Sequence, residues 1–226
     1  MKKIRDHRFA DIVMAALFAA IPASILCQTT SDGSMPQYYF LNFTQGKVIM
    51  KNGQVQTPMM NYNTVTEKMV FTRDEKYYDL SNPEMVDTVI IQDIRFVPAG
   101  KVFYEVLITG PAALFLQYKG ELLPAGKPVG YGGTSQVASS TYVTTVDLSG
   151  GRYNLPLPTD FTVKISPVYW IRRNGGMVSF LNEKQFLNLF PDKTDKLKAF
   201  IRGNRIKIDR KEDVIKLVNY CTGLNN

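Results

Sequence analysis

The stretch RFVPAGKVFYEVLIT (Arg95–Thr109) decides the fold, because it places a turn between two strand-like runs. Pro98, Ala99 and Gly100 have turn composition, and the runs on either side are rich in β-branched and aromatic residues. Within 101–109 two sets of side chains alternate: Val102, Tyr104, Val106 and Ile108 with Phe103, Glu105 and Leu107. One face of this strand is wholly apolar and the other is mixed, which predicts a central strand of a sheet.

Outward from this stretch, short strand-like runs separated by turn residues continue from Tyr38 to Phe180. Asn52-Gly53 predicts a hairpin with a type I′ turn. Further hairpins are predicted at 73–75 and 174–176, strands at 114–118, 141–147, 162–167 and 168–172, and a long loop over the Gly- and Pro-rich segment 120–136. Tight turns favour antiparallel pairing, because parallel strands need crossovers of about a dozen residues.

After Phe180 the period of the apolar residues becomes helical. Asn182 is predicted to cap a helix that ends before Pro191, and a second helix over 194–202 is predicted to stop at Gly203. Asp209 and Glu212 have the spacing of a capping pair for a third helix, on which Cys221 falls on the apolar face and is expected to be a buried thiol. We therefore expect an α+β fold, with antiparallel β-sheets of sandwich or barrel type over 28–181 and a small helical unit over 182–226.

Residues 1–27 have the order of a secretory signal: a basic start, an uncharged run from Ile12 to Leu26, and then a polar stretch. The 16 uncharged residues that end at Cys27 are fewer than the roughly 20 that a membrane-spanning helix needs. We expect export to the periplasm or outer cell surface, with cleavage after Cys27. Cleavage after Ala23 and lipid attachment at Cys27 are the alternatives.

The only histidine, His7, lies inside this signal, so the mature chain would contain none. Ser-His-Asp and Cys-His catalysis are then excluded, and zinc and copper lose their commonest neutral ligand. We expect no cofactor and no metal site. Acid-base catalysis by a pair of carboxyl groups needs no histidine and therefore remains possible. The candidate acids are Asp79, Asp87, Asp93, Glu105 and Glu121.

Charge is uneven along the chain. Residues 28–171 hold 11 basic and 12 acidic side chains, whereas residues 172–226 hold 12 basic and 6 acidic ones. The mixed signs of the helical part predict a solvated surface, and export argues against nucleic acid as the partner.

Aromatic side chains are the strongest indication of binding. Trp170 beside a hairpin turn and Tyr131 in the Gly-rich loop are the candidate binding residues, because flat rings stack on sugars or clamp extended peptides. We expect a noncatalytic binding or assembly protein of the cell envelope, with a glycan, a peptide or an envelope protein as partner. The alternative is a carboxylate-dependent hydrolase that acts on glycan or cell-wall material.

Several segments carry a resemblance to a known group of proteins. They are the Gln28 start, 46–53, 61–71, 86–96, 103–106 and 190–220. In these the chain resembles a group of uncharacterised secreted proteins of gut-dwelling Gram-negative anaerobes. The resemblance covers most of the mature chain and implies an exported, β-rich protein, but it brings no established activity.

Overall fold

A computed structural model describes residues 35–124, 127–129, 133–135, 161–173 and 175–224. The strands are β1 (Thr44–Met50), β2 (Val55–Gln56), β3 (Met59–Asn63), β4 (Lys68–Arg73), β5 (Lys76–Asp79), β6 (Val86–Ile91), β7 (Ile94–Ala99), β8 (Val102–Ile108), β9 (Leu114–Pro124), β10 (Lys127–Val129), β11 (Gly133–Ser135), β12 (Phe161–Arg173) and β13 (Gly176–Phe180). The helices are η1 (Pro83–Met85), α1 (Glu183–Asn188), η2 (Pro191–Lys193), α2 (Thr194–Asn204) and α3 (Lys211–Gly223).

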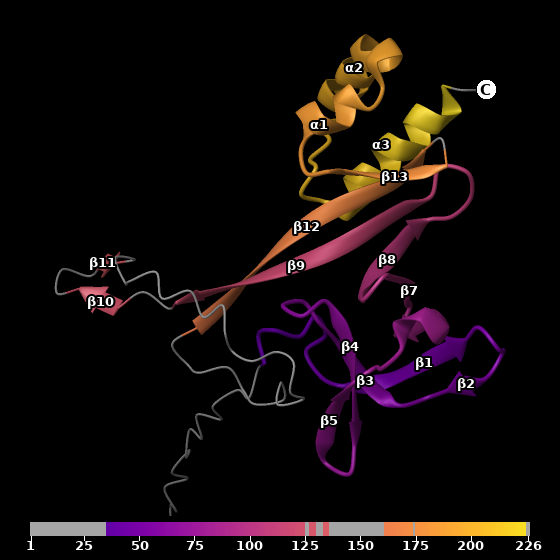
Figure 1. Cartoon of the computed structure of the whole chain (residues 1–226). Coiled ribbons are helices and arrows are strands. Elements are labelled where there is room, and N and C mark those ends of the chain that lie inside the picture. The colour runs from indigo at the N-terminus through magenta and orange to yellow at the C-terminus, as the bar shows by residue number, and fades with distance from the viewer. Residues whose placement is uncertain (1–34, 125–126, 130–132, 136–160, 174, 225–226) are drawn as a thin grey trace, which may run out of the picture. The chain divides into compact units, whose positions relative to one another are not determined.

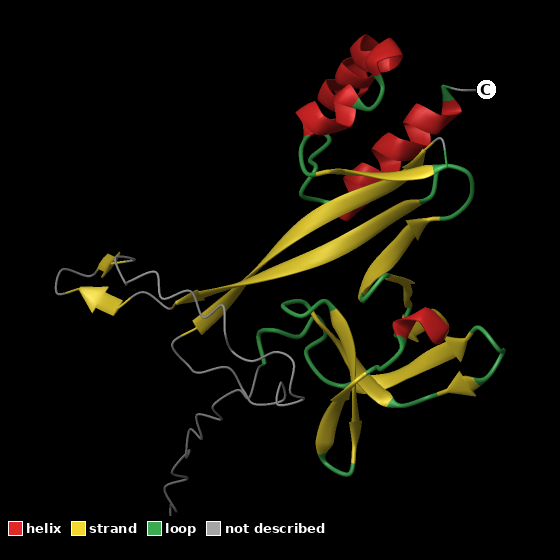
Figure 2. Cartoon of the chain, viewed as in Figure 1, coloured by secondary structure: helices red, strands yellow, loops and turns green. Residues whose placement is uncertain are grey.

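Eleven of the described strands form one sheet in the order β13-β12-β9-β8-β7-β6-β1-β3-β4-β5, with β2 beside β1 (Figure 1). Every strand pair in the described part of the chain is antiparallel. Apart from η1, the helices follow the last strand and lie together as one group (Figure 2). This confirms the predicted class of antiparallel sheet with a C-terminal helical unit, and the sheet is open rather than closed into a barrel.

Strand β8 lies between β7 and β9, as its pattern predicts. Glu105 on β8 belongs to a row of directly opposed residues that crosses seven strands and is at most 5% exposed. We call this set the buried row: Val48, Val89, Phe96, Glu105, Leu116, Tyr169 and Phe180. Glu105 is its only charged member, and the partners of that charge are described with the site.

The sheet curls so that β3 approaches β8 and the β3–β4 connection approaches β9. The Tyr62 hydroxyl donates to the carbonyl of Phe103 at 3.2 Å, and the amide of Gly120 donates to the carbonyl of Thr64 at 2.8 Å. A Cβ at Gly120 would lie 2.7 Å from Thr64 Oγ1 and 3.0 Å from its carbonyl carbon. Glycine is therefore the residue that permits this approach.

The helices share one core with the strands. Phe180 at the end of β13 packs edge-on against Phe186 of α1, with ring centroids 5.0 Å apart. Asn182 caps α1 by accepting from the Gln185 amide at 2.9 Å, as predicted. Cys221 is buried on the inner face of α3, which confirms that this thiol is buried as predicted.

Several local predictions were wrong. At Asn52-Gly53 only Gly53 has positive φ, so the loop is a type I turn followed by a left-handed glycine, whereas Asp74 and Glu75 both have positive φ as a type I′ turn requires. Strand β9 continues through 120–124, where a loop was predicted, and 162–172 is part of one continuous strand.

Two helix ends also differ from the prediction. Helix α2 runs through Gly203 to Asn204, and the residue that caps its end, Arg205, adopts the left-handed conformation. Helix α3 begins after Arg210 and has no side-chain cap, so Asp209 does not cap it. The strand predicted at 141–147 lies outside the described residues, as does Tyr131.

Candidate functional site

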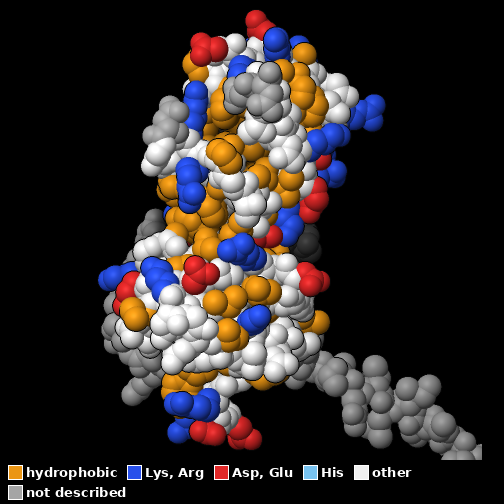
Figure 3. All heavy atoms as spheres, turned by 90° about the vertical axis from the view of Figure 1, so that its right-hand side faces the viewer, with side chains coloured by type: hydrophobic (Ala, Val, Ile, Leu, Met, Phe, Trp, Pro, Cys, Tyr) orange, Lys and Arg blue, Asp and Glu red, His pale blue; other side chains and the backbone are white. Residues whose placement is uncertain are grey.

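The face of the sheet opposite the buried row carries an open groove of about 710 Å³, which we call the aromatic groove. Among the described residues, its lining comes from strands β6 to β9, β12 and β13 and the connections between strands, without any contribution from the helices. Figure 3 shows hydrophobic side chains gathered across the middle of the face that it displays, with Lys and Arg side chains beside them. A groove of this size lies within the usual range of ligand sites.

Alternation along the strands brings the groove residues together. Phe115 of β9 lies directly opposite both Val106 of β8 and Trp170 of β12, and Val97 of β7 lies opposite Tyr104 of β8. The wholly apolar face of β8 is thus the half-buried one in the groove, whereas its mixed face, with Glu105, is turned to the core. An apolar strand face left uncovered indicates an interaction surface.

The Trp170 ring is held in a fixed orientation. It stacks on Tyr104 with centroids 5.6 Å apart and an interplanar angle of 16°. Its Nε1 donates to Gln117 Oε1 at 2.8 Å, and Gln117 Nε2 donates in turn to Glu67 Oε2. Burial and the nearby charge of Glu67 raise the pKa of Tyr104 above its ordinary value. The pair is a rigid, hydrogen-bonded platform.

Charged groups at the groove are mainly basic. Lys51, Arg95 and Arg172 line it, against Asp87 as the single acid among the described lining residues. Arg172 Cζ lies 5.7 Å from the centroid of the Phe115 ring, and Arg95 Nη2 donates to Thr88 Oγ1 at 3.3 Å. The groove therefore combines an aromatic floor with hydrogen-bond donors.

Asp87 reaches the groove through an irregularity in β6. In the pairing with β1, Ile49 lies opposite Thr88 but Met50 lies opposite Val86, so Asp87 is left out of the register. Such bulges re-aim a side chain, and this one gives the groove its acid.

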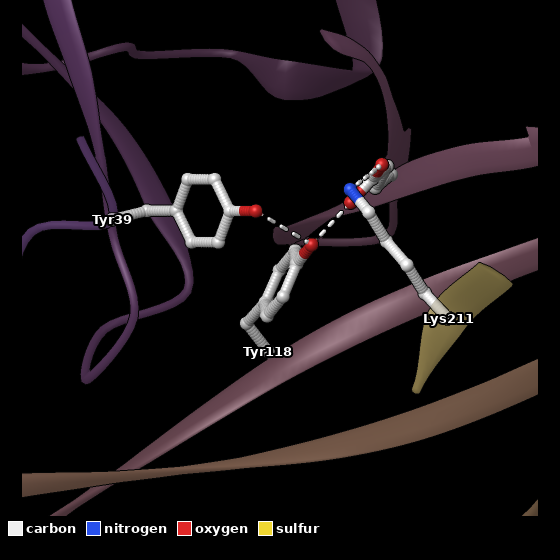
Figure 4. A network of polar contacts seen from close by, with 4 residues as sticks. Tyr39, Tyr118 and Lys211 are labelled. Carbon is white, nitrogen blue, oxygen red and sulfur yellow. Dashed lines mark hydrogen bonds and ion pairs between the residues drawn. The ribbon is translucent and has the colours of Figure 1, made fainter. Parts of the chain in front are cut away.

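On the core side, Glu105 is the centre of a polar network (Figure 4). Its Oε1 accepts from Lys211 Nζ at 3.0 Å, and its Oε2 accepts from the Tyr118 hydroxyl, which shares a 3.1 Å hydrogen bond with the hydroxyl of Tyr39. Burial acts to lower the pKa of Lys211, but the hydrogen bond and charge of Glu105 outweigh it and raise that pKa. Burial and Glu105 raise the pKa of Tyr118. This network joins α3 to β8 and β9.

The structure separates the predicted acids. Asp79 forms an ion pair with Lys68 at 2.6 Å, Glu105 lies on the core side, and Asp87 lies in the aromatic groove. Asp93 and Glu121 are exposed outside the groove. Among the residues that the structure describes, no three acidic or cysteine side chains gather as a cation site.

Of the two predicted binding residues, Trp170 lines the groove, whereas Tyr131 lies outside the described residues. The sequence did not identify Tyr104 and Phe115 as the neighbours of Trp170 in the groove. The signal for Tyr104 was present in the apolar face of 101–109, but the opposition of Phe115 to Trp170 depends on a register set by residues far apart in the chain.

No protein-family model, curated protein or solved structure matches this chain. None of the helices in the described ranges has the length and apolar character to span a membrane.

Proposed function

We propose that this chain is an exported, noncatalytic glycan-binding protein of the cell envelope, and that the aromatic groove holds the glycan. One observation carries the proposal, namely the stacked Tyr104–Trp170 pair on an uncovered sheet face. Sugars present flat C–H faces to aromatic rings and hydroxyl groups to polar neighbours. The groove offers both kinds of contact.

Binding is favoured over hydrolysis by the distribution of acids. Hydrolysis of a glycosidic bond by the usual route needs two carboxyl groups that flank the bond. Asp87 is the one acid among the described lining residues of the groove. A rigid platform with donors at its rim suits capture without turnover.

A panel of purified short oligosaccharides, both neutral and uronic-acid types, tests this proposal by isothermal titration calorimetry. At least one should bind the wild-type protein, and Trp170→Ala should weaken that binding about thirtyfold, the loss expected when an aromatic hot spot worth about 2 kcal/mol is truncated. Tyr104→Ala should also weaken it. Tyr78→Ala is the matched control, because Tyr78 also stacks on a ring, that of Phe71 at 5.6 Å, but lies outside the groove.

Three results would contradict the proposal. The first is equal loss of binding in Tyr78→Ala and Tyr104→Ala when both variants are folded. The second is release of smaller sugars by the wild-type protein that Asp87→Asn abolishes, which would establish the hydrolase instead. Tight binding of an extended peptide in place of every oligosaccharide would also reject the glycan.

A further inference from the structure

A second pocket, of about 380 Å³, lies where the end of β12 meets the β8–β9 connection, η2 and α3. We call it the arginine pocket. Arg172, Arg173 and Lys193 line it, with Asp192 as the single acid among its described lining residues. It shares Arg172 with the aromatic groove but no other described residue.

Both guanidinium groups are held by aromatic rings rather than by carboxylates. Arg173 Cζ lies 4.7 Å from the centroid of the Phe190 ring, and Arg172 is held over Phe115. Within the described part of the chain, neither guanidinium forms an ion pair or a side-chain hydrogen bond. A ring contacts the face of a guanidinium and leaves its N–H donors, which lie in the plane, available to an oxyanion.

The basic side chains at this pocket outweigh one group that disfavours an anion. That group is the C-terminus of helix α3, which ends at the pocket, because the carbonyl groups at a helix C-terminus repel negative charge. Lys193 Nζ donates to the Cys221 carbonyl at 3.2 Å, which offsets part of that repulsion. Residues 172–226 hold 12 basic and 6 acidic side chains, so the field of this part of the chain attracts anions.

The rest of the lining is apolar. Phe190, Ile171 and Val218 form one part, and Pro111 and Ala112 of the β8–β9 connection form another. We infer that the arginine pocket is a second binding site, for a small organic anion with a carboxylate or phosphate group on an apolar body. The anionic group would accept hydrogen bonds from Arg173, and the apolar body would contact Phe190.

Titration calorimetry with benzoate and phenyl phosphate tests the site and the choice of oxyanion, with inorganic phosphate and benzyl alcohol as the two half-ligands. One of the aromatic anions should bind at least tenfold more tightly than either half-ligand. Arg173→Gln should weaken it about tenfold, because hydrogen bonds to charged groups are the strong ones. Ala112→Leu, which fills the pocket without changing charge, should also weaken it.

Arg95→Gln is the matched control, because Arg95 lines the aromatic groove alone and its variant should bind the aromatic anions normally. Arg173→Gln should in turn leave oligosaccharide binding intact, so the two proposals can fail separately. The inference is overturned if neither benzoate nor phenyl phosphate binds. So does an equal loss in Arg95→Gln and folded Arg173→Gln, and so does inorganic phosphate binding as tightly as phenyl phosphate.

Discussion

Replacement of Lys211 by Met should destabilise the protein strongly, although Lys211 is the first residue of a helix. A lysine in the first turn is unfavourable for the helix dipole, so its removal alone should gain about 0.5 kcal/mol. Glu105, however, would lose the cation that faces its carboxylate, and the side chain of Glu105 is only 7% exposed. The loss of one partner of a buried ion pair costs about 3–5 kcal/mol.

The side chain of Lys211 is 33% exposed, so the lower end of that range applies, and after the gain from the helix dipole the net cost should be about 2.5 kcal/mol. For a chain of this size that cost corresponds to a fall in Tm of about 5–10 °C. Urea unfolding at neutral pH measures the loss in the free energy of unfolding.

Two comparison variants make this measurement specific. Lys216→Met removes an exposed lysine from the same helix and should change the free energy of unfolding by less than about 0.5 kcal/mol. The double variant Glu105→Leu with Lys211→Met replaces the pair by apolar side chains and should recover most of the loss. A single Lys211→Met protein as stable as Lys216→Met would refute the reasoning.

Two further predictions concern the packing of β9. Gly120→Ala should lower the free energy of unfolding by about 1–3 kcal/mol, because the new Cβ meets the backbone of Thr64, whereas Gly203→Ala in α2, which has open space around it, should be neutral or stabilising; equal thermal shifts would contradict this. The raised pKa of Tyr118 means that the folded state keeps this proton above about pH 10, where the unfolded chain loses it, so stability falls as the pH rises. In Tyr118→Phe the slope of that fall, from urea unfolding between about pH 10 and 11, should be smaller by up to about 1.4 kcal/mol per pH unit, and an unchanged slope would reject the assignment.

The sequence predicted the features that depend on local chemistry. Hairpins at 50–54 and 73–76, the turn at Gly100 and the cap at Asn182 all follow from residues close together in the chain. The two faces of β8 were also visible as an alternation. These signals sufficed for the antiparallel class and the helical tail.

What the sequence could not predict depends on distant partners. The strands predicted separately at 162–167 and 168–172 are one strand, and β12 continues through Pro167 because β13 pairs only from Tyr169 onward and leaves one side of Pro167 without a neighbouring strand. Arg205 rather than Gly203 takes the left-handed position, which sequence preference does not favour. Trp170 could be predicted as a binding residue from its residue type and its place beside a hairpin turn. The stacked Tyr104–Trp170 pair could not, because it depends on the pairing of β8, β9 and β12.

Strand β8 buries its less hydrophobic face, and this has a consequence for folding. A slip of β8 by one residue would exchange its two faces and turn Val102, Tyr104 and Val106 to the core, an alternative that hydrophobicity alone does not disfavour. Such a slip would also carry Glu105 away from Lys211 and Tyr118, which have no second carboxylate partner in the described part of the chain. We expect the Glu105 network to fix the register of β8. The double variant Glu105→Leu with Lys211→Met should therefore keep its stability but show additional amide signals by NMR from chains in the wrong register.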